Sequence, residues 1–241
     1  IPFTIIEKNL PTPSEFDDIR SLTLNSTTHE RLKQLGIETS PSVIQSMSVL
    51  DGLGTGSLGF SAQEANLDYL AAVLNFSDLR DSLLEKVSSS VISGQEIASF
   101  HSNQTGITAV LSDDSELEAS LLVVAEGRNS KLAELISPDK TQTDYQQIAR
   151  TFLVHIPELE NDKAIQVFYE KEIFALMPYN RTDASNTFSV VWSMPNNNLA
   201  PKSQDELLLD LSKFEKKLAC SIEPISEILF FPLFGHHLKE Y

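Results

Sequence analysis

The sequence is poor in cysteine and has no long apolar run. Cys220 is the single cysteine among 241 residues, which excludes an internal disulfide framework and favours a reducing compartment. No apolar run approaches the roughly 20 residues that span a bilayer. The longest ones, Leu121–Ala125 and Ile228–Phe234, have the length of core strands. No basic leader precedes the strand-like opening, so we expect a cytoplasmic protein.

Basic residues are also few. Lysine and arginine number 18 against 34 aspartates and glutamates, which gives a formal net charge of -16. Nucleic acid phosphates would repel such a chain, so a nucleic acid partner is not expected. The hydrophobic fraction of 41% and the charged fraction of 22% are ordinary for a soluble globular protein with a sizeable core.

The usual signatures of amino-acid catalysis and metal binding are missing. Gly52-x-Gly54-x-Gly56 lacks the spacing of a dinucleotide turn or P-loop and predicts a turn between strands. His236-His237 has no partner at helical spacing, and no nucleophile elbow occurs, so we predict no metal site and no catalytic side chain. Two classes remain open: a binding module, or an enzyme whose chemistry belongs to a cofactor.

The hydrophobic pattern predicts an α/β (α+β) chain: a partial nucleotide-binding layer that carries an inserted antiparallel sheet. A parallel strand over 1–7 would end at Glu7, which either binds an adenosine ribose or is a solvated strand end. Two helices are predicted to start at the caps Thr27 and Ser77. A third, amphipathic helix is predicted over 203–219. Strands are predicted over 43–50, 107–111, 117–125, 147–156, 164–170, 173–178, 187–194 and 228–234, with 120–125 buried on both faces.

Several segments, taken together and in order, resemble a known family. The segments are Phe3–Glu7, Phe16–Leu24, Glu30–Ile37, Ile44–Asp51, Leu121–Ser130, Tyr145–Ala149, Phe168–Pro178, Ser189–Trp192 and Phe231–Leu233. They are similar to the FAD-dependent hydroxylases of ubiquinone biosynthesis, class A flavoprotein monooxygenases related to p-hydroxybenzoate hydroxylase. Within that family, Asp18-x-Arg20-Ser21-Leu22 and Ser130–Ala133 most resemble the 2-octaprenyl-6-methoxyphenol hydroxylases.

The resemblance implies a fold and a reaction. Residues 1–40 and 75–140 would be the remnant of the FAD-binding domain. Residues 41–74 and 141–234 would be a substrate-binding sheet with the helix 203–219. NAD(P)H would reduce the bound FAD, O₂ would convert it to a C4a-hydroperoxyflavin, and a prenylated phenol would accept the hydroxyl group. A ubiquinone-biosynthesis protein complex and peripheral membrane contact are further expectations.

The resemblance also assigns site residues. Glu7 would bind the adenosine ribose, Arg20 the flavin pyrophosphate, and Glu126 and Gly127 the pyrophosphate edge. The substrate wall would comprise Phe174, Leu176, Pro178 and Trp192. From the residues alone, alternatives remain open: Arg20 could pair with Asp17 or Asp18, and Leu176 and Trp192 could be core residues.

Departures from the family pattern suggest an internal fragment. The chain opens without methionine, and the family's first glycine motif and its Gly-Asp-Ala motif would lie before Ile1 and after Tyr241. Glu126 replaces the usual aspartate, and Glu172 stands where relatives commonly have glycine. We therefore expect the 241 residues alone to bind no FAD tightly. The alternative is a short, non-catalytic paralogue that binds a prenylphenol or scaffolds a biosynthetic complex.

Overall fold

The computed structural model describes residues 1–10, 18–104, 106–127, 129–136, 140–179, 186–196 and 204–238. The chain divides into two compact units. The smaller unit comprises Ile1–Glu15, Val87–Tyr145 and Phe234–Tyr241, and the larger one Phe16–Lys86 and Gln146–Leu233. Residues 16–40 and 75–86, which we assigned to the FAD layer, cluster with the larger unit. The assignment of cofactor and substrate domains stays a prediction.

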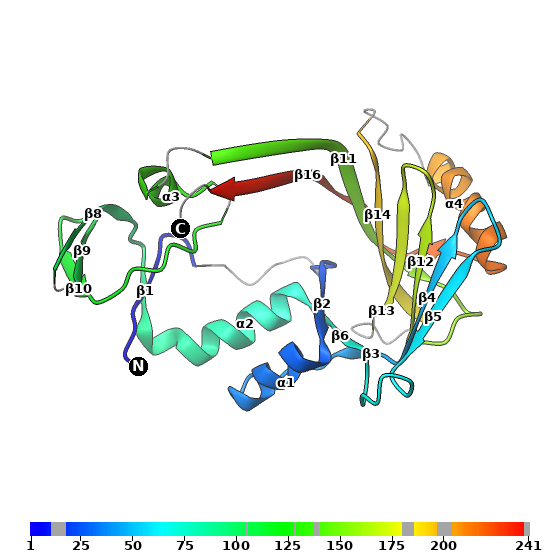
Figure 1. Ribbon diagram of the computed structural model, residues 1–241, viewed down its shortest axis with the longest axis horizontal. Coiled ribbons are helices and arrows are strands. Elements are labelled where there is room, and N and C mark those ends of the chain that lie inside the picture. Colours follow the sequence, from blue (N-terminus) through cyan, green and yellow to red (C-terminus); the bar gives the residue numbers. More distant parts are fainter. Residues whose placement is uncertain are drawn as a thin grey trace. The chain divides into compact units, whose positions relative to one another are not determined.

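The smaller unit contains two small sheets. In the first, β1 runs parallel to β7, so the predicted parallel strand that ends at Glu7 is confirmed. In the second, β8, β9 and β10 form an antiparallel meander, which confirms the predicted hairpin. The elements are β1 (Ile5–Glu7), η1 (Ser88–Ser90), β7 (Val91–Ser93), β8 (Ile97–Asn103), β9 (Gly106–Leu111), β10 (Glu116–Ala119) and α3 (Lys131–Ile136) (Figure 1).

The strand predicted over 117–125 is confirmed only in its first half. Strand β10 ends at Ala119, and residues 121–125 have no regular structure. Leu121 and Val123 are 72% and 73% exposed, whereas we expected the stretch 120–125 to be buried on both faces. An apolar run becomes a buried strand only where neighbouring strands take up its hydrogen bonds and layers cover both faces. The described part of the smaller unit supplies neither.

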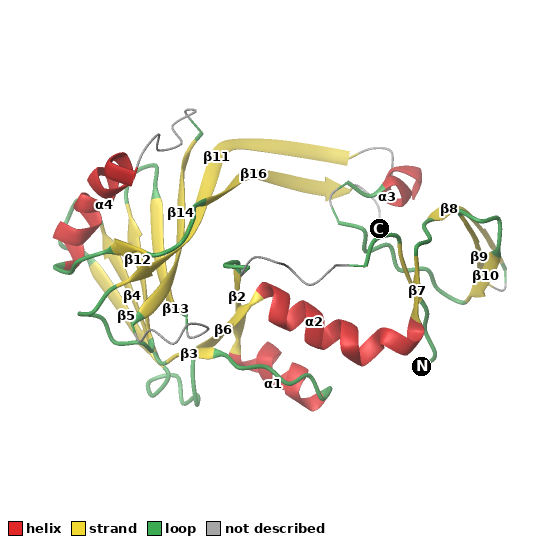
Figure 2. Cartoon of the chain, turned by 180° about the vertical axis from the view of Figure 1, so that it is seen from behind, coloured by secondary structure: helices red, strands yellow, loops and turns green. Residues whose placement is uncertain are grey.

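The larger unit is built on an eight-stranded sheet in the order β15-β11-β14-β13-β12-β4-β5, with β16 also paired to β11. Strands β4 and β12 run parallel, and the other neighbours for which a register is given run antiparallel. The strands are β4 (Ser46–Asp51), β5 (Ser57–Ser61), β11 (Lys140–His155), β12 (Lys163–Phe168), β13 (Ile173–Pro178), β14 (Thr187–Pro195), β15 (Glu223–Pro224) and β16 (Leu229–Leu238) (Figure 2). The expected inserted antiparallel sheet is confirmed.

Helix α4 (Gln204–Leu218) covers one face of this sheet (Figure 1). Its apolar stripe of Leu207, Leu211 and Phe214 packs on alternate residues of the strands, as the predicted amphipathic helix requires. Phe214 is fully buried and stacks on Phe174 with 3.9 Å between ring centroids. This interface is the main hydrophobic core of the chain.

The turn between β4 and β5 is the glycine-rich loop that the sequence predicts. Gly52 lies against the ring of Tyr169, which a Cβ atom would approach to 2.7 Å, so a side chain there would displace the ring. Asp51 accepts a hydrogen bond from the Leu53 amide, and Lys217 Nζ donates to the Gly54 carbonyl oxygen. The turn is thereby attached to the last turn of α4.

A second sheet of the larger unit, in the order β2-β6-β3, carries two helices. Our capping residues were wrong by two positions. The Asn25 side chain caps α1, and Asn75 Oδ1 accepts from the Asp78 amide at the start of α2. Asparagine serves as well as serine or threonine at this position, so residue type alone cannot choose between neighbours. The elements are β2 (Ser21–Asn25), α1 (Ser26–Gln34), β3 (Ser42–Ile44), β6 (Ala71–Asn75) and α2 (Phe76–Val87).

A buried histidine fixes α1 to the following segments. His29 is 1% exposed. Its Nδ1 lies 2.7 Å from Tyr69 Oη and its Nε2 lies 3.0 Å from Thr39 Oγ1. Burial is the main cause that lowers the pKa of His29 below 6.5, and the Lys33 cation adds to it. The folded protein therefore holds this imidazole in its neutral form.

We predict that this histidine makes stability fall in mild acid. The pKa of His29 is lower in the folded protein than the ordinary value of 6.5. The contribution of the neutral imidazole to the free energy of unfolding is therefore complete above pH 6.5 and is lost as the pH falls below it. The slope for one proton is at most about 1.4 kcal/mol per pH unit. Urea unfolding between neutral pH and pH 5 measures it. His29→Gln keeps polar contacts but cannot titrate, so in this variant the unfolding free energy should no longer fall with pH in this range. If the dependence on pH is unchanged, other groups cause it.

Candidate functional site

The predicted substrate wall lies on the helix side of the large sheet. Phe174, Leu176 and Trp192 are at most 1% exposed and belong to the core beneath α4. Trp192 Nε1 also donates to the Glu172 carboxylate at 3.0 Å, and Lys213 Nζ contacts the same oxygen at 2.6 Å. Pro178 is buried at the end of β13. These side chains are packing residues in this structure, which is the alternative that the sequence left open for Leu176 and Trp192.

The opposite face of the sheet is formed by the intervening residues. Ile173, Ala175 and Met177 alternate with the buried residues of β13, and strand pairing puts Phe168 opposite Ile173. The small sheet β2-β6-β3 covers one part of this face, where Ile44 and Val73 pack near Ala164, Met47 and Met177. The part near β4, β5 and the end of β12 stays exposed.

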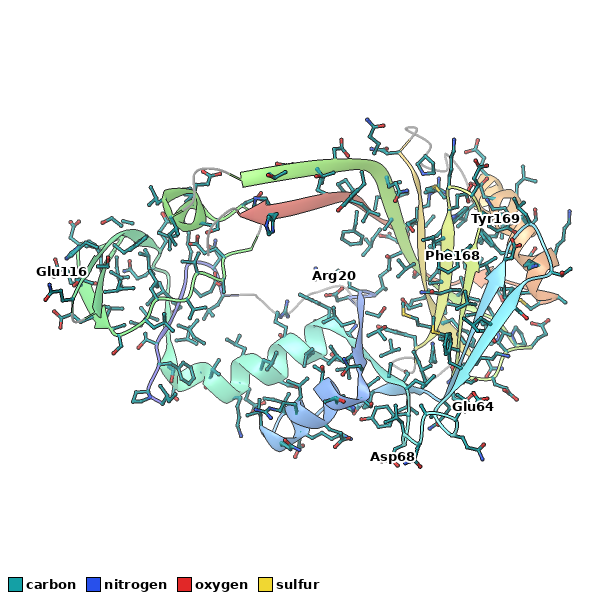
Figure 3. The ribbon with its side chains drawn as sticks, in the orientation of Figure 1. Arg20, Glu64, Asp68, Glu116, Phe168 and Tyr169 are labelled. Carbon is teal, nitrogen blue, oxygen red and sulfur yellow. The ribbon has the colours of Figure 1, made fainter. Side chains whose placement is uncertain are left out.

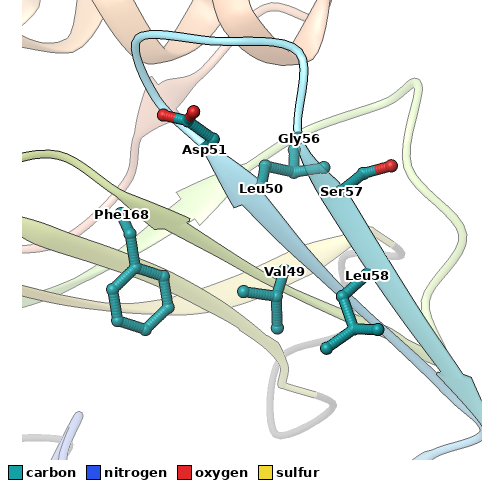
Figure 4. Close-up of a pocket in the computed structure, with 7 residues that line it drawn as sticks. All are labelled: Val49, Leu50, Asp51, Gly56, Ser57, Leu58 and Phe168. Atoms are coloured by element: carbon teal, nitrogen blue, oxygen red, sulfur yellow. The ribbon is translucent and has the colours of Figure 1, made fainter.

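An apolar hollow lies on this exposed part of the sheet (Figure 4). It is shallow and measures about 370 Å³. Phe168, at the end of β12, and Leu58, on β5, are 41% and 56% exposed (Figure 3 labels Phe168). The lining, which we call the edge hollow, consists of Val49, Leu50, Asp51, Gly56, Ser57, Leu58 and Phe168. Sequence reasoning did not select these residues. Val49, Leu58 and Phe168 lie on the face away from α4, whereas Leu50 packs against the core beneath α4.

Arg20 directly precedes β2 and pairs with Asp18 (Figure 3 labels Arg20). Its Nε and Nη2 donate to the two carboxylate oxygens at 2.9 and 2.7 Å, and its guanidinium lies 4.2 Å from the centre of the Phe76 ring. This confirms the Asp18 alternative. Hydrogen bonding to Arg20 is the main cause that lowers the pKa of Asp18, and the same bond raises the pKa of Arg20. Arg20 is still half-exposed, and among the described residues none accepts a hydrogen bond from its Nη1.

A second hollow, of about 310 Å³, lies beside α2. Its lining includes the acids Glu38 and Asp78 together with Asn75. Two acidic side chains without a basic one disfavour a phosphate ligand, since like charges repel. The hollow is therefore a poor place for the pyrophosphate of a dinucleotide.

Glu7 lies where the resemblance implies, at the carboxyl end of the parallel strand β1. The side chain is exposed, and Oε1 accepts a hydrogen bond from the Asn9 amide at 3.0 Å. In the described part of the chain Oε2 has no hydrogen-bond donor. The carboxylate can therefore accept ribose hydroxyls, as acids at this position of a nucleotide-binding strand do.

Glu126 has a structural task that the sequence reasoning missed. Its Oε2 accepts from Ser130 Oγ at 2.6 Å and from the Leu132 amide at 3.4 Å, at the start of α3. Gly127 has φ of +79°, a conformation that favours glycine, and a Cβ atom there would meet nothing within 4 Å. The backbone beside Gly127 is thus open to a ligand, whereas one oxygen of Glu126 is occupied by the helix start.

These residues fit parts of an FAD site. In the smaller unit, Glu7 offers an acceptor for ribose hydroxyls and Gly127 an open backbone. In the larger unit, the half-exposed Arg20 offers a donor for a phosphate. In the described ranges no helix is long and apolar enough to cross a membrane.

Several solved structures have a similar fold, and two of the three described here are named with FAD. HpxO from Klebsiella pneumoniae, solved with FAD and uric acid, is 17% identical with a TM-score of 0.65, covering 89% of this chain and 58% of that one. A protein described as an FAD-containing monooxygenase from Photorhabdus luminescens subsp. laumondii is 13% identical with a TM-score of 0.63, covering 97% and 70%. The 2,6-dihydroxypyridine-3-hydroxylase of Arthrobacter nicotinovorans is 14% identical with a TM-score of 0.56, covering 80% and 50%.

These likenesses confirm the predicted fold. The chain spans 60% and 58% of the length of two HpxO structures that it matches. A family model described as an FAD binding domain matches residues 1–215, which is most of the sequence. FAD is the cofactor of that family, as we expected. The chain therefore belongs to the FAD binding domain family.

Proposed function

We propose that the protein carrying this chain is an FAD-dependent monooxygenase that hydroxylates a prenylated phenol in ubiquinone biosynthesis. The observation that carries the proposal is the edge hollow, where Val49, Leu58 and Phe168 present an apolar surface on the face of the sheet away from α4. An isoprenoid tail needs such a surface, because apolar contacts that exclude water drive its binding. The sequence resemblance to 2-octaprenyl-6-methoxyphenol hydroxylases supports the same substrate class.

The division of work follows from the residues. When bound, FAD would supply the redox chemistry by which NAD(P)H and O₂ give a hydroxylated ring and water. Glu7 accepts hydrogen bonds from the ribose, and Arg20 donates to the phosphates through Nη1 while Asp18 holds its guanidinium. Val49, Leu58 and Phe168 hold the tail and keep water from it. No side chain has to act as nucleophile, which agrees with the lack of catalytic motifs.

Tail recognition gives a direct test. Phe168→Asp places a charge in the edge hollow, so the KM for a prenylated methoxyphenol should rise about tenfold or more, equivalent to roughly 1.4 kcal/mol. The kcat and KM for the same phenol without a tail should stay unchanged. The measurement is product formation coupled to NAD(P)H oxidation by the flavin-loaded gene product.

Leu209→Asp is the matched control, because Leu209 is 74% exposed on α4, the helix that covers the other face. It should leave both substrates unaffected. An equal effect of Phe168→Asp on both phenols would refute the tail contact. A colourless protein that binds the prenylated phenol without oxidising NAD(P)H would instead support the non-catalytic paralogue.

A further inference from the structure

Among the strands that the structure describes, β5 is the outermost of the large sheet, and only one of its edges is paired. It is the last strand in the sheet order and pairs with β4. Leu58 and Phe60 are 56% and 46% exposed. They point to the same face of the sheet, because they are two residues apart. An edge of this kind is a template for another strand.

The phase of the ladder shows which backbone groups face outward. The Asp51 amide donates to the Gly56 oxygen, and the Ala62 amide donates to the Gln45 oxygen, at the two ends of the β4–β5 pair. Hydrogen-bonded pairs recur every second residue, so Leu58 and Phe60 bond to β4. The N–H and C=O groups of Ser57 and Gly59 therefore point away from the sheet. At the strand end, the Ser61 oxygen accepts from the Ala65 amide.

The edge lacks the features that usually block such pairing. Residues 57–61 contain no charged residue and no proline, and the register with β4 has no bulge. A Cβ atom on Gly59 would meet nothing within 4 Å, so a second backbone can approach. Glu64 and Asp68 lie beyond the strand (Figure 3).

The strand is also complementary to itself. We propose that β5 pairs antiparallel with β5 of a second copy of this chain, about a two-fold axis at Gly59. Read in either direction, Ser57-Leu58-Gly59-Phe60-Ser61 presents serine, apolar residue, glycine, apolar residue, serine. The pairing aligns the outward groups of the two Gly59 residues and puts Leu58 opposite Phe60 of the second copy, on one face. Such cross-strand apolar pairs stabilise antiparallel sheets.

Symmetry favours a second copy over another partner. The net charge of -16 opposes self-association at most surfaces, but residues 57–61 carry no charge, so this edge adds no local repulsion. A two-fold contact uses the same edge of both copies and closes on itself, so the assembly ends at a dimer. Phe60 of the second copy would then lie beside Leu58 at the rim of the edge hollow. The proposal does not depend on the proposed reaction.

A proline at position 59 should block the pairing between two copies without breaking the β4–β5 pair of the fold. The Gly59 amide points outward, so Gly59→Pro removes a bond to the second copy and keeps the bonds of Leu58 and Phe60 to β4. We expect sedimentation equilibrium of the complete chain at micromolar concentration to show a dimer. Gly59→Pro should give the monomer mass, and Gly59→Ala, which retains the amide, should stay dimeric.

Two further comparisons decide the matter. Leu58→Lys should give a monomer while Leu209→Lys, an equally simple change on α4, should not. Gly59→Cys in a Cys220→Ser background should form a dimer that reductant separates, because paired Cα atoms about 5.5 Å apart can be bridged. A monomeric parent chain, a dimeric Gly59→Pro variant, larger oligomers, or equal behaviour of the two lysine variants would overturn the proposal.

Discussion

Replacing Phe214 by alanine should lower the free energy of unfolding of the larger unit by about 3–5 kcal/mol. Its ring stacks on Phe174 and meets Trp192 edge-on with 5.1 Å between centroids. Truncation removes these aromatic contacts and leaves a cavity between α4 and the sheet, which the rigid strands cannot fill. The effect is large because one side chain joins the helix to two adjacent strands.

Trp192 is the only tryptophan in the chain, so its fluorescence during urea unfolding reports on this interface. Leu209→Ala is the control: the residue lies on the same helix but is 74% exposed, and its truncation should change the unfolding free energy little. A loss below about 1 kcal/mol for Phe214→Ala would contradict the packing described here.

Arg20→Met should destabilise the larger unit by about 1–2 kcal/mol at neutral pH, since the half-exposed arginine holds the nearly buried carboxylate of Asp18. The side-chain bond from Arg20 is the main cause of the lowered Asp18 pKa, and burial opposes it. In the parent chain this stabilisation is present above pH 3.8 and is lost as the pH falls through the lower folded-state pKa. The difference in unfolding free energy between Arg20→Met and the parent chain should therefore become smaller below pH 3.8.

Urea unfolding at several pH values measures this narrowing, and an NMR titration of the Asp18 carboxyl group should show a higher pKa in Arg20→Met. Lys8→Met, which removes an exposed ion pair with Glu96, should cause no measurable change. A pH-independent difference would show that Arg20 acts through packing on Phe76 rather than through its charge.

Flavin binding to the gene product tests whether Arg20 also binds the flavin phosphates, in addition to its role in stability. Asp18→Asn keeps the arginine cation and should retain flavin, whereas Arg20→Met should weaken binding about tenfold or more, because it removes a charge-assisted contact. Equal losses in the two variants would assign the effect to local folding instead.

Local patterns predicted part of the strands, whereas β2, β5, β6, β7 and β8 have no counterpart in the prediction. The bounds of β13, Ile173–Pro178, match the prediction at both ends, because in the sequence mostly polar residues stand on either side of the apolar stretch. The same alternation cannot tell which face is covered by a helix. That choice is made by Leu207, Leu211 and Phe214 of α4, which come later in the chain than both β13 and β14. Phe174, Leu176 and Trp192 were therefore assigned to a substrate wall, although they lie in the core.

The candidate site was less predictable, because its residues serve two purposes. The sequence indicated an acid at Glu126 but not that its carboxylate also binds the start of α3. Arg20 was found from a motif, while its orientation depends on the pairing with Asp18. Leu121 and Val123 look like a core strand in composition, yet a strand needs neighbours that sequence periodicity does not provide.

The parallel pairing of β4 with β12 sets the order in which the larger unit can form. Ser46 pairs with Lys163, so closure of this contact brings together residues more than a hundred positions apart, at a high entropic cost. The β4–β5 hairpin can form at once from neighbouring residues, but it has to wait for β12 before it joins the sheet. During synthesis its apolar edge, with Leu58 and Phe60, is therefore exposed before the rest of the sheet exists. A ribosome-bound chain that ends before residue 163 should depend on chaperones more than one that extends past β14.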